Sequence, residues 1–450
     1  MLNDAQRCST IPYLNDLCST ISRSPILWLT VPMSELPMPF AHLDLSATLL
    51  RAITERNYSA PTAIQAAAIP EILGGRDILA CAATGSGKTA AFALPILQRL
   101  ETALPEAPRR IQALILVPTR ELAAQIGESF ASYSKYFERR IKIISAFGGV
   151  SINPQMMALR GGADIVVATP GRLLDLVDHN ALRLNDVRTL VLDEADRMLD
   201  LGFAAELARV LEMLPAKRQT VLCSATFPTE VHALAERLLS NPARVEVPTT
   251  VANAPSIEQR AIHVDAAKRT PLLRHLIALH GWQRVLVFVA TKYSAEHVAE
   301  KLKRAGTEAA AFHGELSQGA RTWALAKFKT QQVQVFVATD VAARGIDIAQ
   351  LPVVVNYDLP RSAVDYTHRI GRTGRAGETG IAVSFVSATT EAHMRLIEKR
   401  NQLRIPRETI AGFEPVEVAG DVTAPPGTGG IKGKRKSKKD KLREAATKQG

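Results

Sequence analysis

A glycine-rich run that ends in lysine and threonine is the stretch whose residue types point most directly to chemistry. It spans Ala82–Thr89, between an apolar stretch typical of a buried strand and one that can continue as a helix. Gly85 and Gly87 would let backbone N–H groups turn inward around an anion, and the start of the helix would add the positive end of its dipole. Lys88 would contact nucleotide phosphates, and Thr89 would offer its hydroxyl to Mg²⁺. The general phosphate-loop pattern has glycine where Ala82 stands, so a flexible turn is the alternative.

An acidic cluster, Asp193-Glu194-Ala195-Asp196, directly follows the apolar stretch Leu190–Leu192. In a sheet of parallel strands, an acidic residue at the carboxyl end of a buried strand lies beside the phosphate loop. Asp193 could hold Mg²⁺ directly or through water, and Glu194 could orient or deprotonate an attacking water. Asp196 would pair within the protein. The alternative is a polar strand end that begins the next helix.

A third candidate, Gln65, lies in a predicted helix for which Thr62 is the expected N-cap. A glutamine at such a position is often solvated. Its amide can instead pair with both the donor and the acceptor of an adenine edge. The residues alone leave these two interpretations open.

The hydrophobic pattern predicts the scaffold that would position these groups. Apolar strand-like stretches alternate with helical ones on both sides of an interruption near Pro242–Pro255. Continuous apolar strands that alternate with helices indicate parallel sheets with helices on both faces. We therefore expect an α/β fold of two tandem domains. The predicted parts are a leader (1–37) without regular structure, a first domain (38–243), a linker (244–256), a second domain (257–412) and a disordered basic tail (413–450).

Composition limits the class of protein and its partners. Of 450 residues, 46% are hydrophobic and 22% charged, which is typical of a soluble globular protein, and no apolar run is long enough to span a membrane. The four cysteines show no metal-ligand spacing, which favours a reducing, cytoplasmic location. The net charge is +11, and residues 431–450 hold nine Lys and Arg against Asp440 and Glu444. A basic tail favours a polyanionic partner, although such a tail can also serve solubility alone.

These features together resemble the DEAD-box ATP-dependent RNA helicases, over about Phe40–Asn401. In that family the phosphate loop also begins with alanine, so the departure at Ala82 disappears. The matching stretches are Ala82–Thr89, Pro118–Leu122, Gly148–Gly149, Thr169–Arg172, Asp193–Asp196, Ser224–Thr226, Val287–Val289, His313–Gly314 with Gln318 and Arg321, Ala338–Asp347 and His368–Arg375. The resemblance implies two RecA-like domains.

The resemblance also implies a role for individual residues. The implied nucleotide-binding residues are Phe40, Gln65, Ala83, Thr84, Gly85, Ser86, Gly87, Lys88, Thr89 and Asp347. The implied catalytic residues are Lys88, Asp193, Glu194, Arg372 and Arg375, with the two arginines acting as arginine fingers. The implied Mg²⁺ ligands are Thr89 and Asp193, partly through water. The implied RNA-binding residues are Arg120, Gly149, Thr169, Arg172, Arg321 and Thr339. Ser224, Thr226, His368 and Arg369 are implied to couple the domains. Tyr58 stays open between a structural role and a contact with adenine.

The implied function is an RNA-dependent ATPase that opens short RNA duplexes or remodels RNA–protein complexes when ATP closes the two domains. It would show little sequence preference, because contacts to the sugar-phosphate backbone carry no sequence information. Complexes of ribosome assembly or RNA decay are the expected setting. An ATP-gated RNA clamp is the alternative, and a DNA helicase is disfavoured by Gln65 and the acidic cluster.

Overall fold

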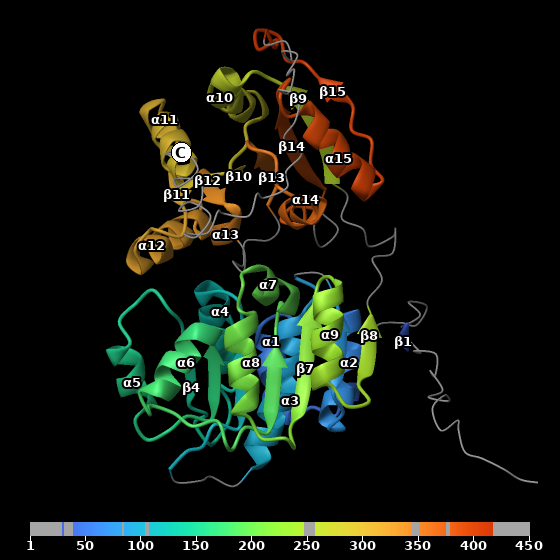
Figure 1. Cartoon of the computed structure of the whole chain (residues 1–450), viewed down its shortest axis with the longest axis vertical. Coiled ribbons are helices and arrows are strands. Elements are labelled where there is room, and N and C mark those ends of the chain that lie inside the picture. The colour runs from blue at the N-terminus through green and yellow to red at the C-terminus, as the bar shows by residue number, and fades with distance from the viewer. Residues whose placement is uncertain are drawn as a thin grey trace, which may run out of the picture. The chain divides into compact units, whose positions relative to one another are not determined.

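The computed structural model describes residues 29–30, 39–82, 85–103, 108–246, 257–343, 351–374 and 379–416. The chain divides into two compact units, residues 1–252 (unit 1) and 253–450 (unit 2), each built on its own sheet (Figure 1). None of the helices in the described ranges is both long and apolar enough to cross a bilayer.

Unit 1 contains an eight-stranded sheet in the order β1-β8-β2-β7-β6-β3-β5-β4, with every pair parallel. Its strands are β1 (Leu29–Thr30), β2 (Ile78–Cys81), β3 (Ala113–Leu116), β4 (Ile143–Ala146), β5 (Ile165–Ala168), β6 (Thr189–Leu192), β7 (Gln219–Ser224) and β8 (Ala243–Glu246). Its helices are the 3-10 helix η1 (Phe40–Leu43), α1 (Ala47–Glu55), α2 (Ala63–Leu73), α3 (Lys88–Thr102), α4 (Arg120–Tyr133), α5 (Asn153–Leu159), α6 (Pro170–Asp178), α7 (Ala195–Asp200), α8 (Ala204–Glu212) and α9 (Thr229–Leu238).

Unit 2 contains a seven-stranded sheet in the order β11-β12-β10-β13-β14-β9-β15, again with every pair parallel. Its strands are β9 (Ile257–His263), β10 (Val285–Val289), β11 (Ala309–Phe312), β12 (Val335–Thr339), β13 (Val353–Asn356), β14 (Gly380–Val386) and β15 (Arg407–Glu408). Its helices are the 3-10 helix η2 (Ala266–Lys268), α10 (Arg269–His280), α11 (Lys292–Arg304), α12 (Gln318–Lys329), α13 (Asp340–Ala343), α14 (Ala363–Ile370) and α15 (Glu391–Asn401).

The central strands are apolar on both faces because helices cover both faces of each sheet. In β3, Ile115 packs into the core that contains α3 and α4, whereas Leu114 and Leu116 pack into the core that contains α6 and α8. Both surfaces of such a strand lose water, so its sequence is a continuous apolar run rather than an alternating one. The predicted fold class is confirmed.

Two local predictions were wrong. The predicted linker includes residues that form β8, which pairs with β2 through Ala243 and Ile78. The spacing of apolar residues from Leu43 to Ile53 predicts one helical stripe, but the stripe is interrupted because Asp44 adopts a left-handed conformation with a φ of 51° between η1 and α1. In the leader range, β1 pairs with β8, and the rest of residues 1–37 lies outside the described residues, as does the tail from residue 417.

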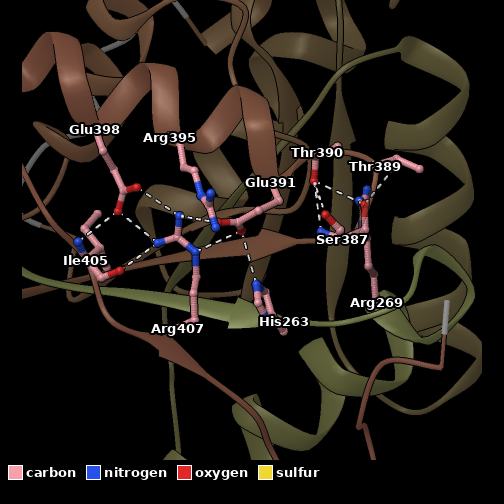
Figure 2. Close-up of polar contacts among 10 residues, drawn as sticks. All are labelled: His263, Arg269, Ser387, Thr389, Thr390, Glu391, Arg395, Glu398, Ile405 and Arg407. Atoms are coloured by element: carbon pink, nitrogen blue, oxygen red, sulfur yellow. Dashed lines mark hydrogen bonds and ion pairs between the residues drawn. The ribbon is translucent and has the colours of Figure 1, made fainter. Parts of the chain in front are cut away.

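An ion-pair network closes the end of unit 2 by joining α15 to β15 (Figure 2). The Arg407 guanidinium donates from Nε to Glu391 Oε2 at 3.1 Å and from Nη1 and Nη2 to the two oxygens of Glu398, both at 2.9 Å. The Glu391 carboxylate also accepts from Arg395 Nε at 2.9 Å and contacts His263 Nε2 of β9 at 3.2 Å. The network therefore links α15, the last helix among the described residues, to two strands of the sheet of unit 2.

We predict that Glu391→Gln destabilises unit 2 at neutral pH and that this cost shrinks in acid. Burial acts to raise the pKa of Glu391, but hydrogen bonds from Arg407, His263 and Arg395 outweigh it and lower the pKa to about 2. A lowered folded-state pKa gives stability above the unfolded value near 4.5, and this stability is lost as pH falls toward 2. Because the carboxylate is partly solvated, we expect a cost of about 1–2 kcal/mol at pH 7.

Urea unfolding at a series of pH values would measure this cost. Tryptophan fluorescence reports on unit 2 once Trp28, which belongs to unit 1, is replaced by Phe in every variant, because the buried Trp282 and the exposed Trp323 both belong to unit 2. Glu300→Gln, at an exposed pair on α11, is the matched control. A difference between Glu391→Gln and the parent protein that does not change between pH 7 and pH 3.5 would contradict the prediction.

Candidate active site

The phosphate-loop candidate connects β2 to α3 at the carboxyl edge of the unit 1 sheet. Gly87 precedes α3 with a φ of 98°, and a Cβ added there would lie 2.5 Å from Gln65 Nε2, so the position requires glycine. The Lys88 ammonium donates to the Ala82 carbonyl at 2.6 Å. In the described part of the loop, the buried Ser86 hydroxyl makes no hydrogen bond. The loop thus offers polar groups suited to an anion.

Gln65 joins the start of α2 to this loop. Its Oε1 accepts a 3.0 Å hydrogen bond from the Thr62 backbone N–H, and its Nε2 donates to the Gly87 carbonyl at 3.2 Å. The residue is 4% exposed, which excludes the solvated alternative. The amide holds the loop in place, and its reading of adenine stays a prediction.

The acidic cluster follows β6 and leads into α7. The Asp193 N–H donates to the Leu116 carbonyl of β3, and Asp193 Oδ1 accepts from the Glu194 N–H, both at 3.0 Å. Glu194 has a φ of 53° and caps α7, so the chain turns sharply here. Its buried Oε2 makes no hydrogen bond within the described residues, and Arg197 Nε lies 3.9 Å away. Such a carboxylate oxygen is available to accept a hydrogen bond from water.

The electrostatics of Asp193 favour a bound cation. Burial raises the pKa of Asp193 to about 6; the Lys88 charge opposes the rise, and the Glu194 charge adds to it. Only β7 separates β6 from β2 in the sheet, so the cluster and the loop are about 10 Å apart, or two strand spacings. Among the described residues, no group of three or more His, Cys, Asp or Glu side chains could hold a metal. Mg²⁺ does not require one, because it binds one or two carboxylates together with substrate phosphates.

The end of β7 is tied to the acidic cluster. Asp196 Oδ2 accepts from the Thr226 hydroxyl at 2.7 Å and from the Thr226 N–H at 3.1 Å. The Ser224 hydroxyl donates to the Thr226 carbonyl at 2.6 Å, and the Ser224 carbonyl accepts from the Ala82 N–H at 3.2 Å. This segment therefore touches both the acidic cluster and the phosphate loop, as a coupling element must. The coupling role itself stays a prediction.

Four predicted RNA-binding residues of unit 1 come together at the carboxyl ends of β3, β4 and β5. Gly149 has a φ of 77°, and a Cβ there would lie 2.7 Å from Arg120 Nη1. Arg172 Nη2 donates to the Val150 carbonyl at 2.7 Å, and Thr169 donates its backbone N–H to Ala146 at the end of β4. The guanidinium of the buried Arg172 leaves Nη1 without a hydrogen bond in the described ranges. These N–H groups share one edge of the sheet.

The predicted site residues of unit 2 also lie near strand ends. Arg321 is buried, and its guanidinium carbon stands 4.7 Å from the centroid of the Phe312 ring at the end of β11. Thr339 ends the neighbouring strand β12. Arg372 follows α14 and is buried, and His368 is half-buried on α14.

Arg369 is held within its own unit. Its Nε and Nη2 both donate to the Asp340 carboxylate at 2.6 Å, and its Nη1 donates to Asn356 at 3.0 Å and to the Asp358 carbonyl at 2.7 Å. These contacts fix the start of α13 against α14. The predicted role of Arg369 in coupling is not tested by them.

Some predicted residues lie outside the description or in the core. The residues outside the described ranges are Ala83, Thr84, Asp347 and Arg375. Phe40 is 5% exposed and packs in the core beside α2, so its predicted contact with a base stays a prediction. Sequence reasoning missed Arg197, the buried cation next to Glu194. Its spacing of three residues along α7 was the available signal.

The two sheets and the site of unit 1 define a nucleotide-binding α/β protein, and comparisons with known proteins place it further. The DEAD/DEAH box helicase model matches residues 62–234, and the helicase conserved C-terminal domain matches residues 268–377. The DEAD-box ATP-dependent RNA helicase CshA of Bacillus subtilis is 39% identical over 368 residues, which cover 82% of this chain and 73% of that protein. The CshA of Geobacillus kaustophilus is also 39% identical, over 82% of this chain and 78% of that protein.

Solved structures agree. Saccharomyces cerevisiae Dbp5 bound to RNA and ADP BeF3 matches with a TM-score of 0.72 and 34% identity, over 82% of this chain and 95% of that chain. Mss116p bound to ssRNA and AMP-PNP matches with a TM-score of 0.75 and 28% identity, over 84% of this chain and 80% of that chain. The chain therefore belongs to the DEAD-box ATP-dependent RNA helicases. It is an ATP-dependent RNA helicase with two RecA-like domains.

We predict that Lys88→Ala weakens ATP binding by about 10- to 100-fold, because a charge-assisted hydrogen bond to phosphate contributes about 1.5–3 kcal/mol. Titration with a fluorescent ATP analogue would measure the dissociation constant. Lys217→Ala removes an exposed lysine of the same unit and is the control. Unchanged affinity in Lys88→Ala would show that the loop does not hold the phosphates.

Proposed function

We propose that this protein is an RNA-dependent ATPase that opens short RNA duplexes locally, or remodels RNA–protein complexes, when ATP and RNA bring its two units together. Dbp5 and Mss116p bind RNA and a nucleotide analogue together, and we extend that property to this chain. The observation that carries the proposal is the buried Glu194 carboxylate oxygen, which makes no hydrogen bond in the described residues and lies beside Asp193. A clamp that only binds RNA has no use for such a group.

In the proposed mechanism, Thr89 and Asp193 would hold Mg²⁺, which would neutralise charge on the ATP phosphates. Lys88 turns from the Ala82 carbonyl to the phosphates. Glu194 orients or deprotonates the attacking water. Arg372 and Arg375 of unit 2 stabilise the charge that develops on the transferred phosphoryl group. Hydrolysis then requires both units, and phosphate release lets them separate.

RNA binding would use the N–H groups at the carboxyl ends of the strands in each unit. The proposed set is Arg120, Gly149, Thr169 and Arg172 in unit 1, and Arg321 and Thr339 in unit 2. Their contacts would be with phosphates and sugars, so sequence preference would be low. Contacts with 2′-hydroxyls would separate RNA from DNA. A strand bent along such a surface cannot stay in an A-form duplex, which would open a few base pairs.

The test is ATP hydrolysis by the full chain with RNA or with DNA of the same sequence. We expect RNA to stimulate hydrolysis and DNA to have little effect. Equal stimulation by both would contradict the RNA assignment. In a parallel assay, displacement of one strand from a duplex of about ten base pairs, a site size typical of strand-binding domains, should require ATP. Stimulated hydrolysis without displacement would favour the clamp.

A further inference from the structure

A basic cleft lies at the free edge of the unit 1 sheet, away from the site described above. β4 is the last strand in the sheet order and pairs only with β5 among the described strands. Ile143 of β4 packs against the core that contains α4, and Ile144 packs against the core that contains α5. A cavity of about 770 Å³ opens between these layers, which is within the range of ligand-binding clefts. We call it the edge cleft.

The edge cleft is lined by cations at the end of the sheet where strands begin. Arg109 precedes β3, and Arg140 and Lys142 immediately precede β4, while Lys135 follows α4. Glu138 is the acidic residue of the lining. The proposed ATP and RNA contacts of unit 1 follow the carboxyl ends of the strands. A four-residue strand separates the two edges by about 13 Å, so the cleft is a distinct surface.

The cations of the edge cleft differ in how they are held. Lys142 Nζ donates to the Arg160 carbonyl at the end of α5 at 2.7 Å, and Arg109 Nε lies 3.2 Å from the buried Asp164. The exposed Arg140 side chain makes no hydrogen bond or ion pair in the described residues. These contacts shape the cleft, while Arg140 and the remaining N–H donors of the Lys142 ammonium are available to a ligand.

Charge and composition together select the ligand class. Lys135 and Arg109 are paired with Glu55 and Asp164, which leaves Arg140 and Lys142 of the lining against Glu138. Exposed cations of this kind bind phosphate through counterion release. The backbone N–H and C=O groups of Lys142 point toward Asp164 and Ile165, on the side of β5. Because successive residues of a strand direct these groups to opposite sides, those of Ile143 and Ser145 face the free edge of the sheet. An acidic peptide could use those groups. RNA is the polyanion that an RNA helicase binds in every cycle. We therefore favour RNA over an acidic peptide as the ligand of the edge cleft.

We propose that the edge cleft binds the phosphodiester backbone of RNA that extends beyond the segment held at the carboxyl edge. This inference rests on the proposed function, because it adds a second RNA contact to it. A second contact on the same strand raises the effective concentration of the first site. Long RNAs are therefore retained better than short ones, without sequence preference and with a stronger dependence on salt.

The test compares the full-length protein with Arg140→Gln and with the double variant Arg140→Gln/Lys142→Gln. Arg140→Gln alone leaves the contact of Lys142 with α5 intact, so it keeps the test valid if the double variant is unstable. The matched control is Lys217→Gln/Arg237→Gln, which removes the same charge from exposed positions before β7 and on α9. The probes are labelled oligouridylates of about eight and thirty nucleotides, which bracket typical single-strand site sizes.

We expect the double variant to bind the long RNA about tenfold more weakly at low salt, with a log–log salt slope smaller by about 1.4, as two lost single-strand phosphate contacts require. The affinity for the short RNA should equal that of the parent protein. The rate of ATP hydrolysis at a saturating concentration of the short RNA should also be unchanged. Unchanged binding of the long RNA, or an equal loss in the control, would overturn the proposal. If the double variant lost binding to an oligoglutamate peptide but kept binding to the long RNA, the proposal would also be overturned, in favour of an acidic protein partner. If RNA fails to stimulate the parent protein, the proposed function fails separately.

Discussion

Glu194→Gln is expected to slow ATP hydrolysis by about 10²–10⁴-fold, which is the usual contribution of a positioned general base. Binding of ATP and of RNA should persist. The substitution keeps the size of the side chain and removes its charge. The φ of 53° at Glu194 and the hydrogen bond from its N–H to Asp193 belong to the backbone, so the cluster should keep its shape. Within the described residues, the buried Oε2 makes no hydrogen bond and has only a weak ion pair with Arg197 at 3.9 Å, so folding should lose little.

Single-turnover hydrolysis at saturating RNA would measure the effect, with ATP and RNA affinities determined separately. Glu212→Gln, at the exposed end of α8, is the control for the loss of one negative charge in unit 1. Normal turnover in Glu194→Gln would remove this residue from the chemistry. Loss of ATP binding together with turnover would instead assign it to binding.

The strands that position the site could be predicted because helices cover both of their faces. The apolar stretches predict strands at Ile165–Ala168, Thr189–Leu192, Ala309–Phe312 and Val353–Asn356, and β5, β6, β11 and β13 have these bounds. Most residues of each strand are buried, as expected where helices cover both faces of a sheet. β8 was missed because it lies near the edge of the sheet. Its sequence, Ala-Arg-Val-Glu, alternates buried and half-buried residues and directly follows Pro242. A proline followed by four residues that alternate between apolar and charged is also typical of a linker, so the sequence did not distinguish β8 from one.

The site was harder to predict where a side chain serves the loop of another element. Nothing in the sequence around Gln65 says that its amide will bond to Gly87, 22 residues later. Asp196 and Thr226 are likewise joined across the ends of two strands, and only the order of the sheet brings them together. Residue types and local spacing predict the chemistry of a motif, whereas the partners of its side chains depend on tertiary packing.

Arg372→Ala should slow RNA-stimulated ATP hydrolysis by about 10³–10⁵-fold, the range attributed to arginine fingers. The phosphate loop and Glu194 belong to unit 1 and Arg372 to unit 2, so under the proposed mechanism one substitution in unit 2 stops chemistry on a nucleotide held by unit 1. Binding of ATP alone should change much less. Arg372→Lys should recover part of the rate, because lysine keeps the charge but lacks the planar fork of donors.

Because Arg372 is buried, the stability of unit 2 must be measured with its activity. Trp282 fluorescence during urea unfolding supplies that check, and Arg404→Ala, at an exposed arginine beyond α15, is the matched control. A folded Arg372→Ala protein that hydrolyses ATP within tenfold of the parent would contradict the proposed mechanism. Hydrolysis would then be complete within unit 1, and RNA would have to stimulate it without bringing in a catalytic group from unit 2.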